Sequence, residues 1–324
     1  MPHTETIHFE NARVLHALYG GKEANLKDVE KALEVRLTTR DAWLKIQGKK
    51  NSVEKVKDLF HHLSIAHERG VRIRRHEFQY ALEAMKGGHG EKLKELWSDA
   101  RLSSKRSIVI PKTFMQRKYL EAIVNHDLVF GLGPAGTGKT FLAVAMAAQA
   151  LNENKIERII LTRPAVEAGE ALGFLPGDLE EKILPYLRPL YDALYALLGV
   201  QETRRLTEKN VIEIAPLAYM RGRTLDHAFI ILDEAQNTTT EQMFMLLTRM
   251  GAESKCVVTG DLTQVDLPHH KKSGLMEAVQ ALRGMKGIEM VTFEETDVLR
   301  HELVTQIIRA YKEHRGAKQT SVSL

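Results

Sequence analysis

Apolar positions fall in two different patterns along the chain. From about residue 105 onward, short and continuously apolar stretches alternate with segments that have helical spacing. Short apolar strands that alternate with helices are typical of a parallel sheet covered by helices on both faces. The pattern therefore predicts an α/β domain over residues 105–316, with six strands at DLVFGLG, RIILTRP, VIEIAP, FIILDEA, CVVTGD and IEMVTF.

The first 64 residues follow another pattern. TIHFE favours a short strand, NARVLHALYG and NLKDVEKAL favour two helices, and EVRLTTRDAWLKIQG alternates apolar and polar residues, as two half-buried strands around a turn do. A capped amphipathic helix, NSVEKVKDLFHHLSIAHERG, follows them. The prediction is a small α+β domain over residues 1–64 with the element order β-α-α-β-β-α.

The segment 65–104 is rich in charged and helix-forming residues, and KGGHG interrupts it at residues 86–90. We interpret it as a charged helical linker. It holds the densest basic cluster of the chain, Arg69, Arg72, Arg74 and Arg75. Such a cluster is usually a solvated helix face, and a contact with a phosphate backbone is the alternative.

Composition narrows the class of protein. The chain of 324 residues is 44% apolar and 27% charged, which is typical of a globular protein with about two domains. No apolar run can span a bilayer, and the polar N-terminus MPHTETIHFE does not resemble a signal peptide. The one cysteine excludes a disulfide framework and a cysteine-rich zinc site. We therefore expect a cytoplasmic protein without membrane contact, and a polar, disordered tail at 317–324.

The strongest chemical signal is a phosphate-binding loop. Residues 133–140 fit the pattern G-x-x-x-x-G-K-[ST], follow an apolar strand and open a helix. Backbone N–H groups and the helix dipole bind phosphate there, Lys139 is expected to reach the β- and γ-phosphates, and the Thr140 hydroxyl is expected to hold Mg²⁺. The predicted nucleotide-binding residues are Gly133, Pro134, Ala135, Gly136, Thr137, Gly138, Lys139 and Thr140.

A second signal is the acid pair in AFIILDEAQNTTTEQ. Asp233 ends an apolar strand and is expected to bind Mg²⁺, while Glu234, pointing elsewhere along the strand, can deprotonate a water molecule. A base beside the phosphates favours nucleotide hydrolysis over transfer to a small molecule, which must exclude water. The alternative is a polar strand-to-helix turn, in which Thr238 and Glu241 form a capping box.

Two glutamines flank these signals. Gln264 follows the strand end in VVTGDLTQVDLP, where an amide can sense the γ-phosphate or position a water molecule; a polar strand-end turn is the alternative. Gln116 precedes the phosphate loop and can offer a donor and an acceptor to an adenine edge, with Tyr119 or Phe114 nearby for stacking.

Five blocks carry a family resemblance: GPAGTGKT, LTRPAVEAGEALGFLPGDLEEKILPYLRPLYDAL, EIAPLAYMRGRTLDHAFIILDEAQNTT, VVTGDLTQVDLP and DVLRHELVTQIIRAY. Together they resemble the PhoH family, phosphate-starvation-inducible ATPases related to superfamily 1 helicases. The resemblance covers residues 105–312. It implies a RecA-like P-loop NTPase core, ATP with Mg²⁺ as cofactors, and a role in RNA metabolism.

The resemblance also implies residue roles. It places Gln116 where related ATPases read adenine, and Gln264 where the γ-phosphate is coupled to the strand-binding side. Arg163 and the loop after it (Gly169, Gly173, Pro176, Gly177) match a single-strand contact of related helicases. Arg300, in DVLRH, matches an arginine of the last family motif and is a candidate arginine finger. Its alternative role is a surface ion pair with Asp297 or Glu302.

The strand count has a consequence for assembly. Superfamily 1 helicases bind ATP between two RecA-like domains, whereas six strands suffice for one. The arginine that completes the site comes either from the same domain or from a neighbouring subunit, and we favour the neighbour. This predicts a homo-oligomeric ring, which the resemblance suggests is a hexamer.

The order β-α-α-β-β-α resembles a KH RNA-binding domain. KH domains clamp nucleic acid with a GXXG loop between their first two helices. This chain has YGGKEANL there, so Glu23 disfavours phosphate, while Lys22, Arg36, Lys49 and Lys50 partly offset it. A docking or oligomerisation domain is the alternative.

Two functions follow. The first is an ATPase that acts on RNA, as a helicase or remodeller working with a ribonuclease. The second is a regulatory ATP-binding scaffold with little turnover that recruits a partner protein. A small-molecule kinase is disfavoured by the acid pair of Asp233 and Glu234.

Overall fold

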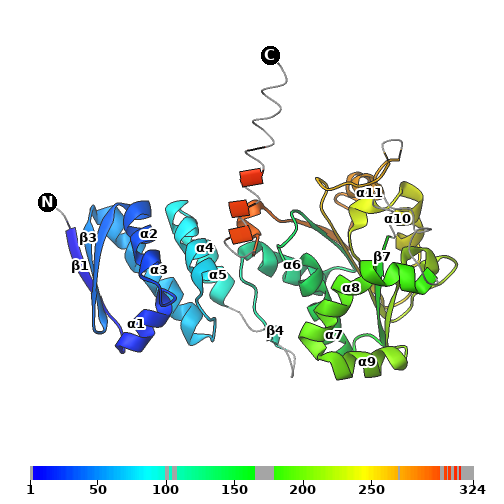
Figure 1. Cartoon of the computed structure of the whole chain (residues 1–324), viewed down its shortest axis with the longest axis horizontal. Helices are drawn as coiled ribbons and strands as arrows, with labels where there is room; N and C mark the ends of the chain where they lie inside the picture. The colour runs from blue at the N-terminus through cyan, green and yellow to red at the C-terminus, as the bar shows by residue number, and fades with distance from the viewer. Residues whose placement is uncertain are drawn as a thin grey trace, which may run out of the picture.

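The structure is a computed structural model of the whole chain (Figure 1). It describes residues 3–98, 102–103, 108–164, 179–268 and 271–299, together with 303–304, 306–307, 310–311 and 314. An N-terminal unit and a larger P-loop unit lie side by side, and helices α5 and α6 make contact between them. The predicted tail, 317–324, lies outside the described residues.

The N-terminal unit begins with the predicted element order. Its three strands form an antiparallel sheet in the order β1-β3-β2. Alternate residues of β3, Leu44 and Ile46, are buried against the helices, as expected for a sheet with one covered face. The elements are β1 (His3–His8), α1 (Ala12–Leu18), α2 (Glu23–Leu33), β2 (Val35–Arg40), β3 (Trp43–Gly48) and α3 (Lys50–Glu68).

The segment expected to be a linker packs as part of this unit. Helices α4 (Arg75–Lys86) and α5 (Gly90–Ser98) both contact α3, and α3 itself continues past residue 64. Apolar residues at helical spacing turn inward while the charged residues lie outside. The expectation of a connecting linker is therefore corrected for the helices of this segment, whose apolar side chains complete the N-terminal core: Phe78, Ala81, Leu82, Met85, Leu93, Leu96 and Trp97.

The P-loop unit is built on a parallel sheet of six strands, in the order β11-β6-β10-β9-β7-β8. All six predicted strands are confirmed. Strands β6 and β9 are buried along their whole length, which explains why their sequences are continuously apolar. The strands are β6 (Leu128–Leu132), β7 (Arg158–Arg163), β8 (Ile212–Pro216), β9 (Ala228–Leu232), β10 (Lys255–Gly260) and β11 (Ile288–Thr292).

Helices cover both faces of this sheet, as predicted. One apolar cluster includes side chains of α6 (Phe114–Asn125), α7 (Lys139–Asn152) and α8 (Leu179–Leu198), and α9 (Val200–Glu208) packs beside α8. The second cluster includes side chains of α10 (Thr240–Leu247) and α11 (Gly274–Ala281). Short elements complete the described chain: strands β4 (Leu102–Ser103) and β5 (Ile108–Val109), and 3-10 turns η2 (Leu217–Met220), η3 (Ala235–Asn237) and η4 (Glu295–Asp297).

The helices of the described residues vary in length and in apolar content. None of them is both long and apolar enough to cross a bilayer.

Candidate nucleotide site

The phosphate loop connects β6 to α7 and depends on glycine. Gly133 has φ 134°, and a Cβ atom there would lie 2.5 Å from the carbonyl oxygen of Phe293. A side chain at this position would therefore both strain the backbone and push away the segment after β11. The loop ends at Lys139, the first residue of α7, so the N-terminus of a helix rich in Ala and Leu faces the loop.

The ammonium group of Lys139 lies inside the curve of the loop. Its Nζ donates hydrogen bonds to the carbonyl oxygens of Gly133 (2.7 Å) and Pro134 (2.8 Å). A cation held there can meet the oxygens of a phosphate that the loop encloses. The Lys139 ammonium therefore lies at the phosphate loop, and its role in reaching the β- and γ-phosphates stays a prediction.

A hydroxyl and a carboxylate meet beside the loop. Thr140 Oγ1 donates to Asp233 Oδ1 at 2.6 Å, although the two residues lie far apart in the sequence. The same carboxylate oxygen accepts a hydrogen bond of 2.8 Å from Thr259 Oγ1, at the end of β10. Hydroxyl and carboxylate oxygens are ligands that suit a hard cation such as Mg²⁺. Thr140 and Asp233 therefore fit the metal that the sequence predicts.

The expectation that strand alternation separates Glu234 from Asp233 is wrong. Strand β9 ends at Leu232, so alternation along a strand does not separate the two acids. Instead Glu234 has a left-handed backbone conformation, with φ 51°. Its Oε1 lies 3.8 Å from Nη2 of Arg163, whose Nη1 lies 3.8 Å from Asp233 Oδ2. Arg163 thus faces both acids from the end of β7.

These residues surround one cleft of about 230 Å³ at the carboxyl ends of the parallel strands. Loops at this edge of an open α/β sheet commonly form the ligand site. The cleft brings together the phosphate loop, the acid pair and Gln264, as the sequence predicts. It is lined by Ala135, Gly136, Gly138, Lys139, Thr140, Phe141, Asp233, Glu234, Gly260, Asp261 and Gln264.

Two amides, the exposed Gln264 and the buried Gln236, hold the acid side of the cleft together. Gln264 Nε2 donates to Asp261 Oδ2 at 2.6 Å. Gln236 donates to Glu234 Oε2 and accepts a hydrogen bond of 3.0 Å from the backbone N–H of Asp261. Gln236 therefore links the candidate base to the end of β10. Sequence reasoning did not single out Gln236 or Thr259; their positions depend on how β9 and β10 pair.

Gln116 supports the phosphate loop from behind. It is 2% exposed, its Nε2 donates to the carbonyl oxygen of Thr137 at 2.9 Å, and its Oε1 accepts from the backbone N–H of Lys112 at 2.8 Å. In this arrangement both ends of the amide bind the chain itself. Its role in reading adenine stays a prediction.

The expectation that Tyr119 stacks on adenine is wrong. Tyr119 is 0% exposed and packs edge-on against Phe293, with the ring centroids 5.4 Å apart. Burial raises the pKa of its hydroxyl well above 10. Phe114 is only half-buried, and the Lys118 ammonium lies 5.0 Å from its ring centroid.

The capping box of α10 also differs from the expectation. Thr239 and Gln242 form it, instead of Thr238 and Glu241, because the helix begins at Thr240. The acid pair is therefore separated from the helix start by the short η3 turn.

Some predicted residues lie outside the described residues: Arg300 and the loop residues Gly169, Gly173, Pro176 and Gly177. The residue before Arg300 is described and reaches the site. Leu299 donates its backbone N–H to the carbonyl oxygen of Gly136, in the phosphate loop, at 2.8 Å. The middle residue of the DVLRH motif therefore contacts the loop directly.

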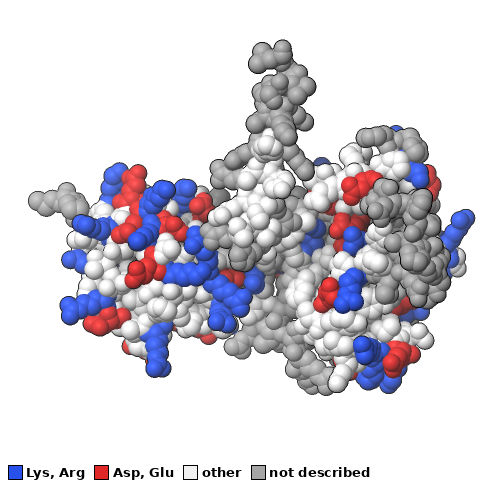
Figure 2. Space-filling view, in the orientation of Figure 1, with Lys and Arg blue, Asp and Glu red and all other residues white. Residues whose placement is uncertain are grey.

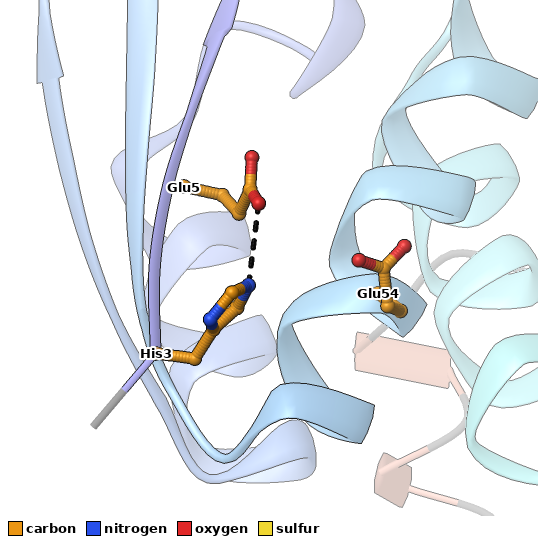
Figure 3. A group of neighbouring side chains, drawn as sticks. All are labelled: His3, Glu5 and Glu54. Carbon is orange, nitrogen blue, oxygen red and sulfur yellow. Dashed lines mark hydrogen bonds and ion pairs between the residues drawn. The ribbon is translucent and has the colours of Figure 1, made fainter. Parts of the chain in front are cut away.

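A group of side chains on the N-terminal unit could also hold a metal ion. His3 and Glu5 of β1 face Glu54 of α3 (Figure 3). However, the Lys57 ammonium lies 3.3 Å from Glu54 and 3.9 Å from Glu5, and His3 Nε2 lies 3.2 Å from Glu5. These ion pairs already balance the carboxylates, so we assign no metal to this group.

Comparison with known proteins agrees with this geometry. A family model described as PhoH-like protein matches residues 108–312. The chain is 49% identical over 296 residues to a PhoH-like protein of Bacillus subtilis, covering 91% of this chain and 93% of that protein. The chain belongs to the PhoH-like family. A PhoH-like protein of Synechocystis is 46% identical over 310 residues, 95% of this chain and 94% of that protein.

Family relatives differ in how much of the chain they match. Protein PhoH of Escherichia coli is 44% identical over 214 residues, which cover 65% of this chain and 60% of that protein. Among solved structures, the UvsW helicase of bacteriophage T4 aligns over 62% of this chain and 66% of that one, at 14% identity and a TM-score of 0.35. Family membership and the P-loop fold together make this chain a nucleotide-binding P-loop protein.

Proposed function

We propose that this PhoH-like protein binds ATP with Mg²⁺ and hydrolyses it. The observation that carries the proposal is the 2.6 Å contact of Thr140 and Asp233, with Glu234 on the same cleft. A hydrolase needs these three side chains together: two oxygen ligands for the metal and a base within reach of the γ-phosphate.

The chain's own residues supply the steps of the reaction. The loop N–H groups and Lys139 hold the phosphates in place, and bound Mg²⁺ neutralises charge on them. Glu234 takes a proton from a water molecule while the oxygen of that water molecule attacks the γ-phosphorus. The bond between that phosphorus and the bridging oxygen breaks, and ADP and phosphate are released.

We further propose that hydrolysis serves RNA metabolism in the cytoplasm. The family resemblance and the single RecA-like sheet support this part of the proposal. One sheet offers one side of a nucleotide site, so a neighbouring subunit of a homo-oligomeric ring, suspected to be a hexamer, supplies Arg300 to complete it. A ribonuclease is the proposed protein partner.

The test is the substitution Glu234→Gln, which keeps the shape of the side chain but removes its basicity. We expect ATP binding to persist and hydrolysis to fall by about 10²-fold or more, the usual contribution of a general base. Glu208→Gln, at an exposed position of α9, is the matched control and should hydrolyse ATP at the wild-type rate.

Two results would contradict the proposal. The wild-type protein, folded and supplied with Mg²⁺, could fail to hydrolyse ATP with and without single-stranded RNA. Alternatively, Glu234→Gln could keep the full rate, which would remove Glu234 as the base.

One observation favours the second candidate, a regulatory ATP-binding scaffold. Glu234 accepts a hydrogen bond from Gln236 and faces Arg163. A carboxylate that is engaged in this way is a weaker base for a water molecule, so hydrolysis of ATP would be slow. The scaffold function predicts tight ATP binding and slow, RNA-independent turnover. In cells that lack the wild-type protein, Glu234→Gln would then restore growth as well as wild type does, whereas the ATPase function predicts that it does not.

A further inference from the structure

A basic groove lies between the N-terminal unit and the P-loop unit. Its volume is about 530 Å³. Figure 2 shows Lys and Arg side chains gathered on the side of the N-terminal unit next to the second unit. The groove is lined by Gly20, Lys22, Arg72, Ile73, Arg74, Arg75, His76, Glu77, Lys112 and Leu299.

The local sequence Val71-Arg72-Ile73-Arg74 explains why two arginines face this groove. The segment precedes α4, and the backbone of Arg74 is extended. Val71 and Ile73 are buried in the N-terminal core, so the residues that alternate with them, Arg72 and Arg74, turn outward on the same side and are exposed. In an extended chain alternate residues stand roughly 6.6 Å apart. The two guanidinium groups can therefore contact neighbouring phosphates of one strand.

The charges of the groove are only partly balanced within the chain. Lys112 lies 3.2 Å from the buried Glu77, and Arg75 lies 3.8 Å from Asp28. Within the described ranges, Arg72 and Arg74 form no ion pair with a carboxylate.

The other nearby residues do not change this balance. Arg69, the remaining member of the basic cluster, is used differently because it donates a hydrogen bond to the carbonyl oxygen of Trp97. Burial lowers the pKa of His76, so this side chain is neutral at pH 7 and adds no charge. The groove thus keeps an excess of positive charge.

Residues 70–73 partly cover the turn at Gly20 and Gly21. A Cβ atom on Gly20 would lie 3.3 Å from the carbonyl oxygen of Ile73, and residues of the 70–73 segment share a hollow with both glycines. The segment before α4 therefore lies against Gly20. The cations that line the neighbouring groove are Arg72 and Arg74, with Lys22 beside them.

The floor of the groove connects to the phosphate loop. The backbone N–H of Lys112 binds Gln116, which in turn donates to the carbonyl oxygen of Thr137. Leu299, at another side of the groove, donates its N–H to Gly136. Two short hydrogen-bonded paths therefore join the groove to the loop that binds nucleotide.

We propose that the groove binds the phosphodiester backbone of a single-stranded nucleic acid, through Arg72, Arg74 and Lys22. The inference rests on the proposed function only in its choice of RNA as the strand. A backbone contact needs cations spaced along an open path and no base-reading groups, which is what the extended arginine pair provides.

The test is the double substitution Arg72→Gln with Arg74→Gln. Binding of a fluorescent single-stranded RNA of mixed sequence is followed by anisotropy without nucleotide, over a range of salt concentrations. Each single-strand phosphate contact contributes about 0.7 to the slope of log K against log salt, so the slope should become less steep by about 1.4. Affinity near 0.1 M salt should fall roughly 25-fold from this effect alone.

The matched control removes two charges elsewhere. Arg204→Gln with Lys209→Gln changes two exposed residues, one on α9 and one directly after it, in the part of the P-loop unit away from the groove (Figure 1). This control should bind RNA with the wild-type slope. Circular dichroism and the melting temperature check that both double variants fold.

The outcomes separate this inference from the proposed function. An unchanged slope and affinity in Arg72→Gln with Arg74→Gln would overturn the groove assignment, even if the wild type hydrolyses ATP. RNA binding that depends on the two arginines would support it, even if no hydrolysis occurs. Single-stranded DNA of the same sequence tells whether the 2′-hydroxyl matters. Binding of a labelled polyglutamate peptide in place of nucleic acid would assign the groove to an acidic protein segment and overturn the inference.

Discussion

The Thr259 hydroxyl offers a direct test of the site, because it binds Asp233, the acid proposed to hold the metal, without lining the cleft. Thr259 Oγ1 donates to Asp233 Oδ1 at 2.8 Å and lies 3.3 Å from the carbonyl oxygen of Leu232. Thr259→Val keeps the shape of the side chain and removes this donor. Asp233 is 6% exposed, so water cannot easily replace the lost hydrogen bond.

The expected magnitude follows from this burial. A hydrogen bond to a charged group contributes about 1.5–3 kcal/mol to stability. For a unit of this size each kcal/mol corresponds to about 2–4 °C, so a loss near 2 kcal/mol should lower the melting temperature by about 4–8 °C. A carboxylate that is less well oriented should also bind metal about tenfold more weakly, as when other partners of metal ligands are removed.

Two measurements check this prediction. Differential scanning calorimetry gives the melting temperature, and ATP binding titrated with Mg²⁺ gives the metal dependence. Thr259→Ser keeps the hydroxyl and should lie close to wild type in the metal titration. If Thr259→Val matched wild type in both measurements, the hydroxyl would not orient Asp233 and our description of the metal site would be wrong.

Two further predictions concern buried groups. The Tyr119 hydroxyl has no hydrogen-bond partner within the described residues, so Tyr119→Phe should raise the melting temperature by about 2–4 °C and leave ATP affinity unchanged; a lower melting temperature would contradict this. Burial raises the pKa of Cys256 to about 12, above its value near 9 in the unfolded chain. The stabilising contribution of the buried thiol is complete below pH 9 and is lost as the pH rises toward 12. Between pH 8 and pH 10 the free energy of unfolding, measured with urea, should therefore fall by about 1.4 kcal/mol more in wild type than in Cys256→Ala. Equal losses in the two proteins would refute this prediction.

The six strands of the P-loop unit could be predicted because buried parallel strands are continuously apolar. Their order could not be predicted from the same property. The sequence of a strand that is apolar on both faces does not indicate which strands flank it. Nothing in LVFGL therefore shows that β6 lies between β10 and β11. The register that brings Thr259 to Asp233 depends on that order, and for this reason Thr259 was missed.

The packing of helices α4 and α5 into the N-terminal core was not predicted, because both helices are rich in charged residues. Their sequences are rich in Lys, Arg and Glu, which favours the interpretation as a solvated linker. The apolar residues Phe78, Leu82 and Met85 nevertheless recur at spacings of three and four, and the structure buries all of them. The composition of the whole segment therefore does not reveal the apolar face of the helix, whereas the spacing of its apolar residues does.

The residues of the candidate site could be predicted where a sequence motif also supplies side chains suited to binding a nucleotide. Lys139, Thr140, Asp233 and Gln264 lie around one cleft because each follows the carboxyl end of a parallel strand, or begins the helix after it. Tyr119 was placed wrongly because its distance from the loop in sequence does not show which face of α6 is buried. The packing of α6 against α7, β11 and β6 decides that.

The position of β6 also bears on how the chain folds during synthesis. Val129 pairs with Val257 and with Glu289, 128 and 160 positions later. At translation rates of about 5–20 residues per second, the second partner is made about 8–32 s after Val129. Until then β6 has at least one unpaired, apolar edge, and such distant pairing slows folding. The nucleotide site is therefore among the last parts of the P-loop unit to be completed, although its loop is among the first to leave the ribosome.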